Sequence, residues 1–334
     1  MGSATEISQT IAARSRPGIP FPLREHSAPA SGAAIRVEFT RLANLGIAGR
    51  PGRAGPSEPA TTDNVLRIVF GSGRGSVLHD ATMPPFLVVP LRGTVRVVDG
   101  HCTRLLRSRR LFVSEHGCNL QIVGGTSALW IAVLAPAPLW RRLFEATADA
   151  PMSAPILLTA VHANDPSILR AMIRAVRAAA REESGRVDAV NAAIGIAARL
   201  AELQTSFEAR IDRCPGRTQA QRRTVFSRLQ RVQSWMEWGT DLSVDLPAFA
   251  RAAGYSTCHF VRIFNAVYGE TPYATLVEKR LDKAHSLIHS TELSITEIAH
   301  AAGFVDRCAF ARSFKRRFGN SASAMRSRRS ALVG

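Results

Sequence analysis

Two stretches of the sequence repeat each other and decide how the C-terminal third folds. Residues 245–255 read DLPAFARAAGY, and residues 294–304 read SITEIAHAAGF, at an offset of 49. Further along, residues 260–264 read FVRIF and correspond to FARSF at residues 310–314, at an offset of 50. The second copy therefore contains one extra residue between its glycine and its first phenylalanine.

Each copy has the pattern of two short helices joined by a turn. Asp245 and Ser294 are expected to cap the first helix, and Ser294 forms a capping box with Glu297. Gly254 and Gly303 are expected to end that helix and start the turn. The phenylalanines that follow give the second helix an apolar face. The pattern predicts two helix-turn-helix modules, in which the second helix enters a DNA major groove.

These motifs resemble the DNA-binding domain of the AraC/XylS family of transcription regulators. The matching pattern is A-x-x-A-G-Y-S-x-x-x-F-x-R-x-F-x-x-x-x-G-x-T-P at residues 250–272. It continues as S-I-T-E-I-A-x-x-A-G-F at 294–304 and F-A-R-S-F-K-R-R-F-G at 310–319. The sequence departs from the family near its end, where Ala322 replaces the usual proline and Met325 replaces an aromatic residue. The resemblance implies a DNA-binding domain over residues 222–328.

The phenylalanine positions also indicate which side chains face DNA. Arg262 and Arg312 are expected to be the main base contacts, because arginine can bond guanine bidentately in the major groove. The alternative is that they are surface or phosphate-contacting arginines. The full set expected to read bases is Cys258, Val261, Arg262, Arg307, Cys308, Ala311 and Arg312. The set expected to contact phosphates, which position the protein without specifying sequence, is Ser256, Lys315, Arg316 and Arg317.

The N-terminal part has a different pattern. Residues 1–34 are rich in Ser, Ala, Pro and Gly and are expected to form a disordered tail. Short apolar runs at 64–70, 86–91, 93–98, 110–113, 119–123 and 128–134 predict strands of a β-sandwich or small barrel. The family resemblance implies that residues 35–211 form a cupin-like, effector-binding and dimerisation domain. The expected fold class is therefore α+β, with an all-α C-terminal domain.

Two helices are expected after the strands. Asp165 and Pro166 mark the start of the first, which has an apolar stripe that includes Ile168 and Met172. The second is expected over about 188–211. Their stripes could mediate dimerisation or simply close the core of their own domain. The polar residues 212–221, with Pro-Gly among them, are expected to be the interdomain linker.

Composition limits the functional classes. The net charge is +17, and the last 36 residues carry eight basic residues and one acidic residue. A basic balance suits a polyanionic partner, although arginine richness can also reflect genome composition. No run of 18 apolar residues is present, so no membrane helix is expected. The five cysteines are scattered, which is typical of reduced thiols in a cytoplasmic protein.

Catalysis is not expected, and neither is a cofactor or metal. His79, His101 and His116 lie on separate strands or turns without an H-x-H pair, so a metal-dependent cupin-type enzyme fused to a DNA-binding domain is a secondary hypothesis. A third is a regulator whose barrel only dimerises. The main hypothesis is an effector-controlled transcription regulator of the activator type, in which an unidentified small molecule shifts a population of conformations. Its expected partners are double-stranded DNA, RNA polymerase and a second copy of the chain.

Overall fold

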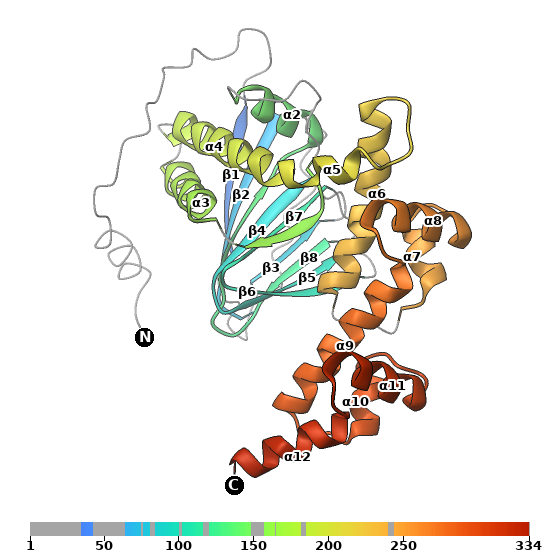
Figure 1. Cartoon of the computed structure of the whole chain (residues 1–334). Helices are drawn as coiled ribbons and strands as arrows, with labels where there is room; N and C mark the ends of the chain where they lie inside the picture. The colour runs from blue at the N-terminus through green and yellow to red at the C-terminus, as the bar shows by residue number, and fades with distance from the viewer. Residues whose placement is uncertain are drawn as a thin grey trace. The chain divides into compact units, whose positions relative to one another are not determined.

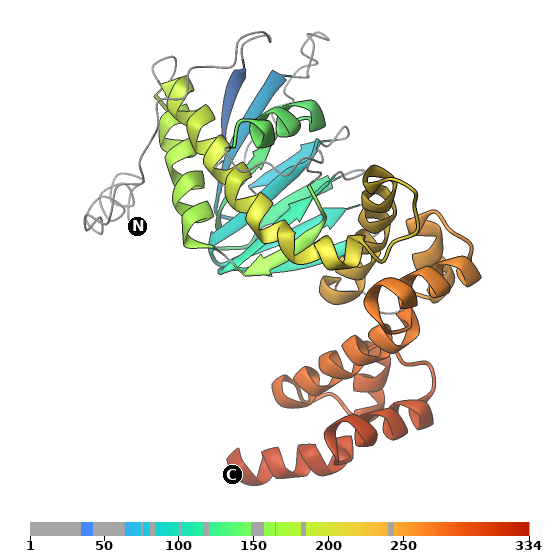
Figure 2. The same ribbon diagram turned by 45° about the horizontal axis from the view of Figure 1, so that its top comes forward.

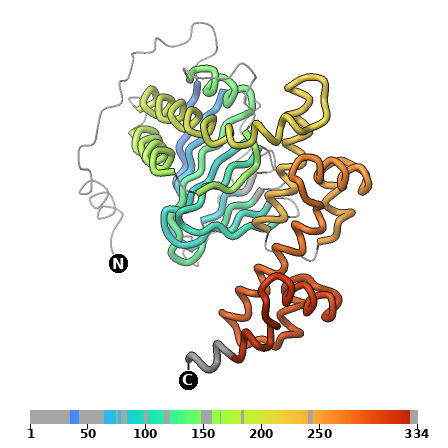
Figure 3. Tube along the Cα trace, in the orientation of Figure 1, coloured from blue at the N-terminus to red at the C-terminus, as the bar shows by residue number. Residues whose placement is uncertain are grey.

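The computed structural model describes residues 35–42, 64–74, 76–80, 84–99, 102–115, 120–147, 157–163, 165–181, 185–239 and 244–333. The expected tail at 1–34 lies outside these residues. Two β-sheets are followed by helices, as the ribbon in Figure 1 and the chain trace in Figure 3 show. The expected α+β class, with an all-α C-terminal region, is therefore confirmed.

The larger sheet has six strands in the order β1-β2-β9-β4-β7-β10. β1 pairs with β2 in parallel, whereas the other neighbours pair antiparallel. The strands are β1 (Arg36–Leu42), β2 (Val65–Ser72), β4 (Phe86–Arg92), β7 (Arg110–Ser114), β9 (Leu129–Leu134) and β10 (Ala160–Ala163). The sheet is buried on both faces, which explains why β4 reads as an unbroken apolar run.

The smaller sheet has four strands in the order β3-β8-β5-β6. They are β3 (Val77–Asp80), β5 (Thr94–Asp99), β6 (Cys102–Arg107) and β8 (Leu120–Gly124). A shared apolar core joins the two sheets, with Phe86 and Trp130 of the larger sheet packed in one cluster with Val97 and Ile122 of the smaller. The described strands form two separate sheets, so a closed cupin-like barrel is not established.

Three helices cover the opposite face of the larger sheet, as Figures 1 and 2 show for α3 and α4. They are α2 (Ala137–Glu145), α3 (Pro166–Ala179) and α4 (Arg186–Gln204). Asp165 caps α3 as expected and also pairs with Arg199 of α4 at 2.7 Å. Burial pushes the pKa of Asp165 upward, but hydrogen bonds from Arg199 and two backbone N–H groups outweigh it and lower the pKa.

The apolar stripes of α3 and α4 mainly pack within their own domain. Ile168, Met172 and Ala197 are fully buried in the core against the larger sheet. This favours the simpler of the two expected roles for those residues. Val187, which is 70% exposed, and the partly buried Ile194 remain on the outer side of α4.

The C-terminal region begins earlier than expected. α6 (Gln219–Trp238) starts with a capping box between Thr218 and Gln221, so the last three residues of the expected linker are helical. Upstream, a 3-10 turn η3 (Thr205–Phe207) and α5 (Glu208–Ile211) end the chain segment that follows α4. Cys214 within the expected linker is buried, and burial raises the pKa of its thiol to about 12. This segment is therefore packed rather than a free spacer.

The two expected modules are present. The first consists of α7 (Leu246–Ala253) and α8 (Thr257–Tyr268), and the second of α10 (Ile295–Ala301) and α11 (Arg307–Phe318). Between them runs α9 (Pro272–Ser290), and α12 (Ala322–Val333) follows the second module. Ala322 is buried and Met325 packs on the same core, so both departures from the family pattern still contribute to packing.

Candidate nucleic-acid interface

The first module is built by local capping interactions. The Asp245 carboxylate accepts a hydrogen bond from the Ala248 N–H at 2.9 Å and starts α7. Gly254 ends α7 in the left-handed region at φ 75°, which a residue with a Cβ rarely adopts. Phe260, Ile263 and Phe264 then hold α8 against α6 and α7 in one buried cluster. The outer face of α8 is thereby determined.

The second module repeats this design with one difference. The expected capping box of Ser294 and Glu297 is formed, and Gly303 has φ 90°. Asp306 then caps α11 by accepting from Cys308 N–H at 2.8 Å. α8 starts with Ser256 as its cap, two residues after the glycine, whereas Asp306 is three residues after its glycine. The extra residue of the second copy therefore falls in the turn before α11.

Val305 stands in that turn and is 95% exposed. Sequence reasoning did not select it, although the change of offset from 49 to 50 pointed to this turn. A bulky apolar side chain so fully exposed beside Arg307 is placed to contact a partner surface. An apolar group of this kind can pack on a thymine methyl in a major groove.

The residues expected to read bases lie on the outer sides of α8 and α11. On α8, Cys258 and Arg262 are exposed, and Val261 is half-buried. On α11, the exposed residues are Arg307, Cys308, Ala311 and Arg312. The structure thus brings each expected group together on one helix face, opposite the buried phenylalanines. Their contacts with bases stay a prediction.

The residues expected to contact phosphates differ in how they are held. The Ser256 side chain makes no capping hydrogen bond at the start of α8, where backbone N–H groups can bind an anion. Lys315 and Arg316 are exposed. Arg317 instead pairs with two carboxylates of α9, Glu278 and, at 2.8 Å, Asp282. Its guanidinium is already occupied within the protein, a fact that sequence spacing did not reveal.

Arg262 also has a partner. Its Nη2 lies 3.0 Å from Nδ1 of His259, one helical turn earlier on α8. The His259 ring makes an edge contact with Tyr255, with ring centroids 5.2 Å apart. The guanidinium of Arg228 from α6 lies 5.9 Å from the centre of the Tyr255 ring. A continuous series of contacts therefore leads from α6 to the outer face of α8.

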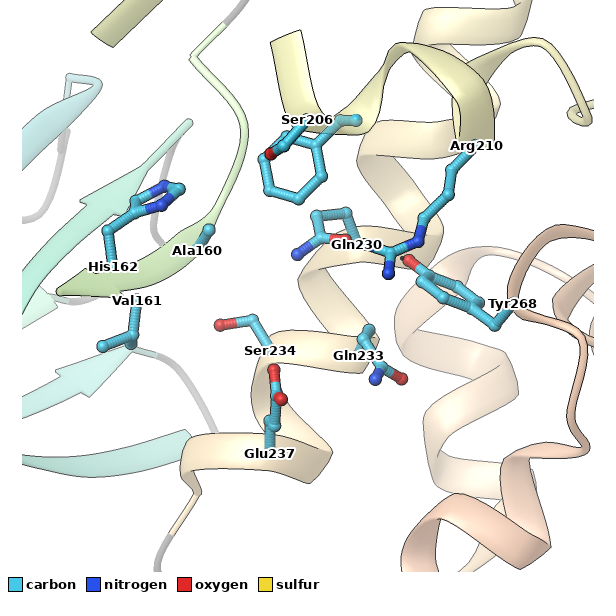
Figure 4. Close-up of a pocket in the computed structure, with 11 residues that line it drawn as sticks. Ala160, Val161, His162, Ser206, Arg210, Gln230, Gln233, Ser234, Glu237 and Tyr268 are labelled. Atoms are coloured by element: carbon cyan, nitrogen blue, oxygen red, sulfur yellow. Dashed lines mark hydrogen bonds between the residues drawn. The ribbon is translucent and has the colours of Figure 1, made fainter. Parts of the chain in front are cut away.

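A pocket of about 220 Å³ lies at the junction of β10, α5, α6 and the end of α8 (Figure 4). Ser234 is 1% exposed, and its hydroxyl has no hydrogen-bond partner among the described residues; the same is true of Oε1 of Gln233. Arg210 and Glu237 bring opposite charges to the pocket. Burial lowers the pKa of His162, which favours its neutral form.

The expected absence of a metal site is not tested here. His101 and His116 lie outside the described residues, as does the side chain of His79. Among the described residues, no group of three potential metal ligands converges. No described helix is long and apolar enough to cross a membrane.

Comparison with known proteins places the C-terminal region in a family. Residues 249–328 match the family described as "Helix-turn-helix domain". The virulence regulon transcriptional activator VirF of Yersinia enterocolitica is 36% identical over 105 residues, which cover 31% of this chain and 39% of VirF. The regulatory protein SoxS of Escherichia coli is 29% identical over 100 residues, which cover 30% of this chain and 94% of SoxS.

The similarity is confined to this region. The chain matches less than two-fifths of the HTH-type transcriptional regulator ExsA of Pseudomonas aeruginosa, at 36% identity over 98 residues that cover 29% of this chain and 35% of ExsA. The match spans both helix-turn-helix modules and agrees with the geometry of α7, α8, α10 and α11. The C-terminal third of this chain belongs to the AraC/XylS family of DNA-binding domains.

Proposed function

We propose that the chain is a transcription regulator that binds specific DNA sequences with α8 and α11. The observation that carries this proposal is the duplicated module, in which each second helix is anchored by phenylalanines and turns arginines outward. Because α9 joins the two modules, they would meet two successive major grooves about 34 Å apart on one DNA face.

Within this proposal the two arginines have the same role. Arg262 and Arg312 read bases from equivalent positions, supported by Cys258, Val261, Arg307, Cys308 and Ala311. Ser256, Lys315 and Arg316 contact phosphates. We assign Arg317 to the packing of α11 on α9, because its guanidinium already binds Glu278 and Asp282. We add Val305 as an apolar contact next to Arg307.

Salt-dependent binding to cognate and scrambled duplexes tests these roles. Arg312→Ala should lose affinity for the cognate duplex by about 1–3 kcal/mol and relax the base preference at one position. Lys315→Ala is the matched control on the same helix. It should weaken binding to both duplexes equally and lower the salt slope by about 0.9. An equal loss for Arg312→Ala on both duplexes would make Arg312 a phosphate contact.

We also propose that residues 35–211 form a cupin-like sensor and that a small molecule binds in the pocket at the junction with α6. Two buried polar groups without partners, on Gln233 and Ser234, support a polar ligand there. The opposite charges of Arg210 and Glu237 suit a small zwitterion or polyol. Such a ligand would touch both β10 and α6, so it could favour one arrangement of the sensor and the first module.

A thermal-shift screen tests this part of the proposal. The probes are free amino acids and sugar acids, each added to the full chain and to the Gln233→Leu variant. A stabilising probe should shift the unfolding midpoint of the wild type, as binding to the native state requires, and not that of the variant. If no probe shifts the wild type, the N-terminal region serves dimerisation alone.

The remaining partners follow from the same proposal. The regulator would act as an activator with RNA polymerase in the cytoplasm, supported by the activator named among its relatives. It would dimerise through the outer side of α4, where Val187 is 70% exposed and Ile194 is only partly buried. Catalysis has no part in this function.

A further inference from the structure

The two modules differ in how their key arginines are supported. Arg262 of α8 contacts His259, three residues earlier, with Nη2 and Nδ1 3.0 Å apart. At the equivalent place before Arg312, the second module has Ala309, which offers no side-chain acceptor. The duplicated fold therefore contains one supported arginine and one unsupported arginine on otherwise matching helices.

Support of this kind has a physical consequence for recognition. An arginine side chain has several rotatable bonds, and ordering it on a base consumes conformational entropy. A neutral histidine with its proton on Nε2 can accept a hydrogen bond from the guanidinium at Nδ1. The bond restricts Arg262 before DNA arrives and leaves its other N–H groups available. Preorganisation of this kind raises the affinity for the correct partner.

The His259 ring is itself held in place. Tyr255, in the turn before α8, packs edge-on against it at a centroid distance of 5.2 Å and an interplanar angle of 63°. Arg228 of α6 lies behind the Tyr255 ring, at 5.9 Å. Tyr255 and His259 are both partly buried, whereas Arg262 is exposed. The acceptor is thus anchored to the body of the module, and the arginine projects from it.

We propose that His259 is a positioning residue that orients Arg262 for base recognition, so that sequence reading by the first module depends on a neutral imidazole. This inference rests on the proposed DNA-reading role of Arg262. The second module, with Ala309 before Arg312, reads its half-site without such a dependence. His259 sets the specificity of one half-site only.

The charged surroundings of His259 give the sign of the pH effect. The groups that face the ring are Tyr255 from the turn and Arg262 from α8, with Arg228 of α6 behind Tyr255. These neighbours are neutral or cationic, so a protonated imidazole gains no opposite charge from them. Protonation removes the acceptor at Nδ1 and places two like charges together. A protonated His259 can also attract phosphates, so overall affinity is a poor readout and base discrimination is the informative one.

The experiment measures base discrimination at each half-site separately in the full-length chain. A cognate duplex, obtained by selection from random DNA, is compared with duplexes mutated in either half-site. The variants are His259→Leu, which removes the acceptor, His259→Asn, whose Oδ1 keeps an acceptor near the position of Nδ1, and His259→Gln, whose acceptor lies farther out. Each is also combined with Arg262→Ala. Circular dichroism and the unfolding midpoint check that the variants fold.

His259→Leu and His259→Gln should reduce discrimination at the first half-site by at least about threefold and leave the second half-site unchanged. His259→Asn should retain it. In the Arg262→Ala background, His259→Leu should have no further effect. Lowering the pH from about 7.5 to about 5.5, which protonates an ordinary histidine, should reduce discrimination of the wild type at the first half-site and spare His259→Asn.

Two results would overturn the inference. One is an equal effect of His259→Leu with and without Arg262, which would make His259 an independent DNA contact. The other is unchanged discrimination in His259→Leu while Arg262→Ala still loses about five- to 150-fold. That second result refutes the role of His259 and leaves the proposed function standing. If Arg262→Ala itself changes nothing at a half-site that Arg312→Ala does not affect, the base-reading role of α8 fails as well.

Discussion

Replacing Arg317 with alanine should loosen the packing of α11 on α9 without removing a contact with DNA. The side chain is 29% exposed and pairs with Glu278 and Asp282, which are about half exposed. Partly exposed ion pairs contribute about 0.2–1 kcal/mol each. Removing Arg317 also leaves two carboxylates one helical turn apart, which repel each other by about 0.2–0.5 kcal/mol. The expected loss is about 1–2 kcal/mol of unfolding free energy.

Urea unfolding and salt-dependent DNA binding together test this prediction. Each phosphate contact contributes about 0.9 to the slope of log affinity against log salt. Arg317→Ala should therefore keep the wild-type slope while its unfolding midpoint falls. Arg316→Ala is the matched control on the neighbouring residue and should show the opposite combination. A slope reduced by about one unit in Arg317→Ala, with unchanged stability, would show that Arg317 is a phosphate contact.

Three further changes have defined outcomes. Ser234→Ala should raise the free energy of unfolding by about 1 kcal/mol in denaturant titrations, because a buried hydroxyl without a partner is removed; a loss of that size would mean that the hydroxyl is bonded. Ile194→Glu should give a folded monomer in sedimentation, and a wild type that is already monomeric at micromolar concentration would refute the dimer. Because the pKa of Asp165 is lowered in the folded state, its stabilising effect is present above about pH 4 and is lost as the pH falls further. Asp165→Asn should abolish that part of the acid dependence of unfolding.

The helix-turn-helix modules could be predicted because their signals are local. Caps such as Asp245 and Ser294 and glycines such as Gly254 act within a few residues of their own position. Each therefore states a helix end whatever the rest of the chain does. The strands that alternate in a sheet, such as those at 86–92 and 129–134, were visible for the same reason.

Features that depend on distant residues could not be predicted. β10 (Ala160–Ala163) is a short strand without an apolar pattern, and it exists because β7 offers a partner edge. The ion pairs of Arg317 join residues 35 and 39 positions apart, and a list of exposed arginines does not reveal them. The pocket at Ser234 likewise draws its walls from separate elements.

The stripes on α3 and α4 show a different limit. An apolar stripe states that a helix face is covered but not by what. Met172 lies on such a stripe and is completely buried against the larger sheet of its own domain. Only its position in the folded chain separates it from Ile194, which is partly exposed. The surface available for a second copy is therefore narrower than periodicity alone indicated.

Selection of binding sites from random duplexes by the full-length chain, followed by footprinting, is the most direct test of the double module. Two readers joined by α9 should enrich a bipartite site, with two half-sites about 10 bp apart and protection on one face of the DNA. Arg262→Ala should relax one half-site, and Arg312→Ala should relax the other. Enrichment of a single half-site that is unaffected by one of these substitutions, or no sequence enrichment at all, would contradict reading by both modules.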